Sequence, residues 1–197
     1  VVSGNGAIDK INAGRLALEG NNSFDGQLNV RSGRVAINSG NSLGQSDNHL
    51  SLSEDTALET AAALTASQSI GIDKQATIDT AGFNSTLSGV VSGNGAIDKI
   101  NAGRLALAGD NSFDGQLNVQ AGRVAINSGS SLGQSDNHLS LSENTALETA
   151  AALIASQSIG IATQATIDTA GFDSTLSGEI SGIGAIDKVG AGRLALT

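Results

Sequence analysis

The sequence predicts an all-β protein, a parallel β-helix (β-solenoid) with about four coils per repeat, and three observations support this. A segment of 89 residues occurs twice and then starts a third time. Short runs alternate apolar and polar residues, which is typical of strands with one buried face. The chain has no Pro, Trp or Tyr and only four Phe, so small aliphatic side chains must fill its interior. A thin stack of coils suits that composition better than one thick core.

The repeat divides the 197 residues into copies at 1–89 and 90–178 and a partial copy at 179–197. We expect these copies to form one single continuous solenoid. Because the chain starts and stops inside a repeat, we also expect it to be a fragment of a longer protein. The stretch GNGAIDKINAGRLALEGNNSFDG, which begins at Gly4, marks the start of each copy.

The two full copies differ at ten positions, and most of the changes exchange polar or small residues, as solvent-facing sites allow. Thr65, which becomes Ile154, is the exception, and we expect this position at a boundary between core and surface. The differing pairs are 19/108, 21/110, 31/120, 32/121, 41/130, 55/144, 65/154, 73/162, 74/163 and 84/173.

Strand signals follow one another through the first copy, separated by the Gly, Asn, Asp and Ser clusters that turns require. We expect Leu16 and Leu18 to point into the core, and Lys10 and Arg15 to be edge or surface charges. The alternating runs are Arg15–Glu19, Gln27–Arg31, Arg34–Asn38, His49–Ser53 and Ser69–Asp73.

Apolar residues within these runs recur at steps of 20–23 residues. Such a step fits one coil of a three-sided β-helix with short turns, so 89 residues make about four coils, stacked at about 4.7–4.9 Å. Across the boundary between copies we predict a longer step of about 27 residues and a bulging loop. The two series are Leu28, Leu50, Ile70 and Val35, Leu58, Ile78.

One stretch, Ser53–Gln68, is rich in Ala, Leu and Glu and favours a helix by intrinsic propensity. Ile70 and the turns around it nevertheless continue the coil period. We therefore predict a strand in this stretch, with a short helix as the alternative.

The stretch Gly4–Ile37 resembles the passenger-associated repeats of autotransporters, the type V secreted surface proteins of Gram-negative bacteria. The family pattern is roughly GxGxLxKxGxGxLxLxGxNxYxGxxxVxxGxLxI. Asn12 stands where Gly is usual, and Phe24 stands where Tyr is usual. The positions that follow the pattern in order are Gly4, Gly6, Ile8, Lys10, Gly14, Leu16, Leu18, Gly20, Asn22, Phe24, Gly26, Val30, Gly33, Val35 and Ile37.

The resemblance implies a right-handed parallel β-helix, export through the outer membrane, and display at or release from the bacterial cell surface. It also implies that the parent protein is anchored by an outer-membrane β-barrel outside this chain. Many proteins that resemble this one are adhesins or biofilm factors, and the repeat itself carries no activity of its own.

Charge and composition exclude several partners. The net charge is −9 and only ten Lys and Arg are spread along the chain, whereas nucleic acid and anionic lipid both require clustered basic residues. The chain has no Cys, which excludes disulfides and thiolate metal sites. We therefore predict no nucleic-acid partner.

The stretch Gly4–Asp9 loosely matches two glycine-rich motifs. A dinucleotide-binding loop needs a third Gly and a following helix, and both are missing. The calcium-binding nonapeptide needs a tandem array and a different glycine–aspartate spacing. We predict a turn at this stretch, with no cofactor and no metal.

A catalytic pair of carboxylates, of the kind that glycosidases use, needs one asymmetric cleft. Here most carboxylates recur in the second copy, and no Trp or Tyr can stack on a sugar, so we predict no catalytic residue and no enzyme. His49 and His138 each stand alone in their copy, without a metal partner or nucleophile nearby in the sequence. The acidic residues considered are Asp9, Asp25, Asp47, Glu54, Asp55, Asp73 and Asp79.

We therefore expect a structural and adhesive segment of a bacterial cell-surface autotransporter passenger. It would act as a rigid spacer, with self-association or binding to a host or surface receptor in adhesion or biofilm, and repeated copies would gain avidity. The alternative is a polysaccharide-active or glycan-binding module on the same β-helix scaffold.

Overall fold

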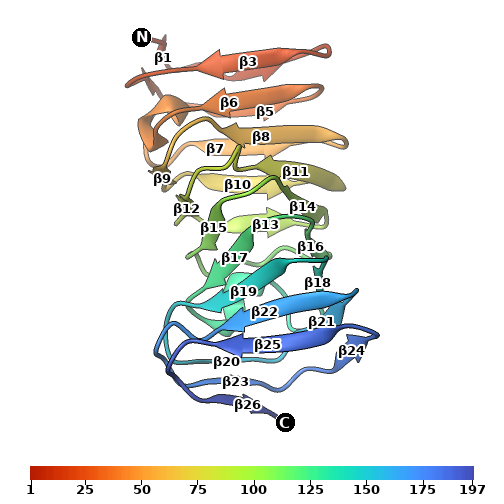
Figure 1. The fold of residues 1–197 in the computed structure, drawn as a ribbon. Helices are drawn as coiled ribbons and strands as arrows, with labels where there is room; N and C mark the ends of the chain where they lie inside the picture. Colours follow the sequence, from red (N-terminus) through yellow and green to blue (C-terminus); the bar gives the residue numbers. More distant parts are fainter.

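The computed structural model describes residues 1–197 and is a rod of about ten stacked turns, with the two termini at opposite ends (Figure 1). Every strand pairing is parallel, and each strand pairs with strands one turn before and after it. The predicted all-β solenoid is confirmed. No helix in the structure is long and apolar enough to cross a membrane.

Each turn contributes one segment to each of three faces of the rod. Face 2 is one unbroken sheet of nine strands. Its strands are β3 (Arg15–Leu18), β6 (Arg34–Ile37), β8 (Thr56–Thr60), β11 (Gln75–Asp79), β14 (Ala96–Ile100), β16 (Leu117–Val119), β18 (His138–Leu141), β21 (Ser158–Ile161) and β24 (Ile180–Gly182).

Face 1 begins with a five-stranded sheet and ends with a three-stranded one. The first sheet consists of β2 (Ile8–Lys10), β5 (Gln27–Val30), β7 (His49–Leu52), β10 (Ser69–Ile72) and β13 (Val91–Gly93). Residues 111–114 and the 3₁₀-helix η2 (Gly129–Leu132) follow, and then β20 (Leu153–Ala155), β23 (Ser174–Leu176) and β26 (Leu194–Leu196).

Face 3 has the same arrangement at the other end of the rod, beginning with β1 (Ser3–Gly4), β4 (Ser23–Phe24) and the 3₁₀-helix η1 (Gly40–Leu43). A seven-stranded sheet continues this face. Its strands are β9 (Leu64–Ala66), β12 (Ser85–Leu87), β15 (Arg104–Leu107), β17 (Arg123–Ile126), β19 (Thr145–Thr149), β22 (Gln164–Asp168) and β25 (Ala185–Val189).

One repeat occupies four and one third turns of the rod. The first copy supplies thirteen segments, β1 to β12 and η1, to three faces, so β13, the counterpart of β1, falls on face 1 instead of face 3. Likewise β2 lies on face 1, whereas its counterpart β14 pairs with β11 and β16 on face 2. Every segment of the second copy therefore lies one face further round the rod than its counterpart in the first.

This offset refines the predicted four coils and explains one wrong prediction. The predicted step of about 27 residues at the copy boundary does not occur, because Ile70 pairs with Val91 and Ala76 pairs with Ile97 at the usual spacing. The additional residues of the repeat form one more strand segment on the rod instead of a bulging loop.

The interior is one cluster of 35 buried apolar residues. The inward series through Leu28, Leu50 and Ile70 is at most 1% exposed, as the alternation predicts. Leu18 is buried and Leu16 is half-buried against the cluster. Each fully buried Leu or Ile contributes about 1.5–3 kcal/mol relative to an exposed position. Stacked turns thus stabilise one another through a narrow aliphatic column.

The stretch Ser53–Gln68 forms the strands β8 and β9, so the predicted strand is confirmed and the helical alternative is wrong. Thr65 lies on the outward side of β9, between the inward-facing residues of that strand. Its counterpart Ile154 is 69% exposed, so the predicted place at the edge of the core is wrong.

Candidate functional site

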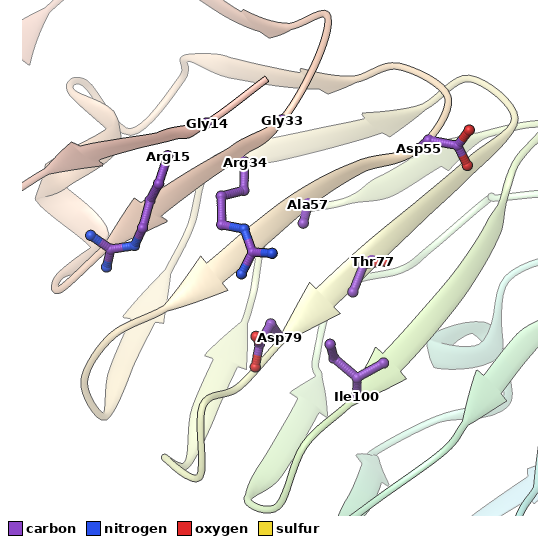
Figure 2. A pocket seen from close by; sticks show the side chains of 9 residues that line it. All are labelled: Gly14, Arg15, Gly33, Arg34, Asp55, Ala57, Thr77, Asp79 and Ile100. Atoms are coloured by element: carbon purple, nitrogen blue, oxygen red, sulfur yellow. The ribbon is translucent and has the colours of Figure 1, made fainter. Parts of the chain in front are cut away.

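A shallow groove of about 510 Å³ lies on the outer side of face 2 in the first copy (Figure 2). Its floor consists of small residues, Gly14, Gly33 and Ala57, and Arg34 extends across it. A Cβ atom on Gly33 would lie 2.4 Å from the backbone oxygen of Gly14, and its φ of +77° favours glycine. The full lining is Gly14, Arg15, Gly33, Arg34, Asp55, Ala57, Thr77, Asp79 and Ile100.

The counterpart of this groove, about 570 Å³ in volume, lies on face 3 in the second copy. Asp55 is replaced there by Asn144, and Ile100 is replaced by Val189. The two grooves are therefore equivalent sites, one in each repeat. The second lies one face further round the rod than the first. The second lining is Asn84, Gly103, Arg104, Gly122, Arg123, Asn144, Thr145, Ala146, Thr166, Asp168 and Val189.

A two-point ion pair lies along one side of each groove. Arg15 Nη2 donates to Glu59 Oε1 at 2.7 Å and its Nε donates to Oε2 at 3.0 Å, across the intervening strand β6. These hydrogen bonds, opposed by partial burial, lower the pKa of Glu59. In the second copy Arg104 and Glu148 repeat the pair at 2.8 Å with a less exposed arginine.

The second arginine of each groove retains free hydrogen-bond donors. Arg34 Nη1 lies 3.8 Å from Glu59 Oε2, and Arg123 Nη1 lies 3.7 Å from Glu148 Oε2 and 3.8 Å from Asp168 Oδ2. These distances are too long for hydrogen bonds. Both side chains are about half exposed, so their guanidinium groups are available to a ligand.

An aspartate provides acceptors in the same groove. Asp79 is 7% exposed, and its Oδ1 accepts hydrogen bonds from the backbone N–H of Ala81 and from Asn101 Nδ2, both at 2.8 Å. Its Oδ2 accepts no hydrogen bond from the chain, and the residue lines the groove. The groove thus places a fixed acceptor on the same outer surface as the free donors of Arg34 (Figure 2).

Sequence reasoning missed a buried lysine. Lys99 is fully buried, and its Nζ donates to Thr80 Oγ1 at 2.9 Å and to the carbonyls of Ile100 and Ala121 at 3.0 Å. Burial lowers its pKa to about 8. Lys10 itself is half-buried, as the prediction of an edge charge allows, and its Nζ donates to the carbonyl of Ser32 at 2.9 Å, whereas its counterpart Lys99 lies inside the rod. Alternation with the inward-facing Ile97 was the signal that could have placed the lysine inside.

The acidic candidates are scattered: only Asp55 and Asp79 line the groove, and they lie well apart in it (Figure 2). Asp9 lies on face 1, where it accepts a 2.7 Å hydrogen bond from Asn29. Glu54 forms an ion pair with Lys74 at 2.9 Å. No group of three or more His, Asp or Glu side chains lies close enough to hold a metal ion. Asp25, Asp47 and Asp73 are exposed at the surface.

The two histidines hold adjacent turns together. His49 Nδ1 lies 2.9 Å from Ser69 Oγ, and His138 Nδ1 lies 2.8 Å from Ser158 Oγ. Burial lowers the pKa of His49. Each ring bridges two stacked strands, which is a structural role.

The chain matches the family described as passenger-associated-transport-repeat twice, at residues 8–37 and 97–126. It is also 33% identical over 127 residues to the adhesin BmaC autotransporter of Brucella suis biovar 1 (strain 1330). That alignment covers 64% of this chain but only 4% of the relative. No solved structure matches the chain.

These matches confirm the resemblance to autotransporter passenger repeats, and the two matched segments each lie near the start of a full copy. A passenger of this kind is exported through the outer membrane and located at the cell surface. The two matched segments also lie one face apart, since the first begins at β2 on face 1 and the second begins in β14 on face 2.

Proposed function

We propose that residues 1–197 are one continuous piece of an adhesive passenger rod that extends and presents binding surfaces away from the cell. The observation that carries this proposal is the uninterrupted stack of parallel strands, which passes from one copy to the next without a loop or a break in the core. Such a stack is stiff because each turn is hydrogen-bonded along its length to its neighbours.

The proposed role is binding without catalysis. The two carboxylates that share the first groove, Asp55 and Asp79, are not both retained in the second, where Asn144 replaces Asp55. A glycosidase needs two carboxyl groups in defined roles. The alternative of a glycan-cleaving module is thus disfavoured, whereas the groove supports binding of glycans.

The proposed partners are a host or surface receptor or a second copy of the rod, and the parent is anchored by an outer-membrane β-barrel. The net charge of −9 opposes close packing of identical rods, because like charges repel. A receptor is therefore favoured over self-association.

Removal of residues 90–178 from the parent protein tests this proposal. The deletion takes out one complete repeat, so every remaining coil can keep its neighbours. We expect cell adhesion to fall while surface display, measured with an antibody, stays unchanged. Unchanged adhesion accompanied by loss of glycan cleavage would contradict the proposal and favour an enzyme.

A further inference from the structure

We propose that each repeat carries one binding site for a neutral oligosaccharide, which is the groove around Arg34 in the first copy and around Arg123 in the second. The inference rests on the proposed adhesive function and names the ligand class for it. It also predicts how the ligand must be arranged, because the two grooves open from different faces.

The donors and acceptors of the groove match sugar hydroxyl groups. A hydroxyl both donates and accepts, whereas an arginine only donates and a carboxylate only accepts. Arg34 has free N–H groups, and Asp79 has a free Oδ2. Neighbouring hydroxyls of one sugar ring can accept from the guanidinium and donate to the carboxylate at the same time.

The charge of the groove favours a neutral ligand. In the second copy the two arginines Arg104 and Arg123 are balanced by the carboxylates Glu148 and Asp168. The first groove has the same four charged groups and one further carboxylate, that of Asp55. Because neither sign predominates strongly, a polyanion or a polycation would meet like charge in the groove.

The surface of the groove fits an extended chain of sugar rings. Its floor lacks side chains at Gly14 and Gly33, and the open backbone there borders the strands of face 2. An aliphatic side chain, Ile100 or Val189, lies on the rim of each groove. That side chain can contact the C–H face of a sugar ring, which a site without an aromatic residue needs.

Because of the offset of one third of a turn, the two grooves lie on different faces as well as at different positions along the rod. They lie on faces 2 and 3, and the four and one third turns between them correspond to roughly 21 Å along the rod at about 4.8 Å per turn. A groove returns to the same face only after three repeats, or roughly 62 Å. A flat surface therefore meets one groove of this chain at a time, whereas a mesh of glycan chains around the rod can fill both.

The test is calorimetric titration of the 197-residue chain with three neutral hexasaccharides, of glucose, of N-acetylglucosamine and of mannose. We expect at least one of them to bind at two sites. Arg34→Gln should weaken the first site, and Arg123→Gln the second, each by about tenfold or more. Arg31→Gln is the matched control, since it removes an exposed arginine of face 1 that is already Gln120 in the second copy.

Circular dichroism of each variant confirms that the rod is folded, so a loss of binding is specific to the groove. A second measurement uses the binding hexasaccharide attached densely to a flat sensor surface. There the unmodified chain should bind within about twofold of the Arg123→Gln variant, because only one groove can engage at a time.

A sulfated heparin hexasaccharide is titrated in parallel as an anionic comparison. Three results would overturn the inference: no binding by any of the three neutral hexasaccharides, binding unchanged in the double variant Arg34→Gln/Arg123→Gln, or binding of the heparin hexasaccharide alone. A large gain in affinity on the flat surface would also overturn the directional part. Each of these outcomes leaves the adhesion result of the repeat deletion intact, so failure of the glycan site is distinguishable from failure of the proposed function.

Discussion

The Nζ atom of Lys99 lies 2.9 Å from Oγ1 of Thr80, in the interior of the rod. The same ammonium group donates to the carbonyl of Ala121 one turn further on. Lys99 therefore connects the corners of three consecutive turns, at the point where the first copy passes into the second. A cation inside a narrow apolar column is stable only because oxygen atoms surround it.

Replacement of this lysine should weaken the whole stack. In Lys99→Met the aliphatic part is kept, but the hydroxyl of Thr80 and the carbonyls of Ile100, Asn101 and Ala121 lose their donor. We therefore expect the free energy of unfolding to fall by about 1–3 kcal/mol. Urea unfolding followed by circular dichroism measures the loss. Lys74→Thr is the control, because Thr163 occupies that position in the second copy. Equal stability of the two variants would refute a structural role for Lys99.

The same residue should make stability depend on alkaline pH. Burial lowers the pKa of Lys99 from 10.5 to about 8 in the folded state, so between these values the unfolded chain binds more protons than the folded chain. Stability should therefore rise with pH from about 8 to about 10.5, by at most about 3 kcal/mol, and stay level below pH 8.

Few other groups of the chain titrate in this pH range. The chain has no Tyr and no Cys, so apart from the N-terminus only four lysines titrate in this range. Unfolding in urea at a series of pH values should show the rise in the unmodified chain and a much smaller one in Lys99→Met. A decrease in stability between pH 8 and pH 10 in the unmodified chain would contradict the prediction.

The two arginine–glutamate pairs allow a comparison inside one molecule. Arg104 is 27% exposed in its pair with Glu148, and Arg15 is 44% exposed in its pair with Glu59. Water screens the more exposed pair better, so double-mutant cycles should give the larger coupling energy for Arg104–Glu148, at up to about 1 kcal/mol. Arg→Gln and Glu→Gln changes, measured by urea unfolding, provide both cycles. The reverse order would show that exposure does not govern these pairs.

The strands and the core followed from local sequence patterns. Alternation placed Leu28 and Leu50 inside, and their 22-residue spacing gave the length of one turn. The same period explains the 44-residue separation of Arg15 and Glu59, which lie two turns apart. A strand is formed by residues that are next to one another in the sequence, so the periodicity of their side chains is sufficient to predict it.

The offset between copies did not follow from those patterns, because it depends on the number of segments in a repeat. Two segments of the first copy, Ser23–Phe24 and Gly40–Leu43, are too short or too irregular to show alternation. Counting only alternating runs therefore gave whole coils and a surplus loop. Lys99 was missed for a different reason, since its charge predicts exposure while its position in the strand is inward. The grooves could not be predicted from the sequence, because their position depends on both the offset and the packing of neighbouring turns.

The offset itself can be tested by cross-linking, because the chain has no native Cys. Thr86 and Ala106 are registered neighbours on face 3, although the counterpart of Ala106 in the first copy, Ala17, lies on face 2. Outward residues on adjacent parallel strands lie within the range of Cα separations that a disulfide bridges. Thr86→Cys/Ala106→Cys should therefore form a disulfide under mild oxidation. Asp79→Cys/Ala106→Cys places the two thiols on different faces and should stay reduced. If the repeat were a whole number of turns, Ala106 would take the register of Ala17 on face 2, beside Asp79, and the pattern of cross-linking would be reversed.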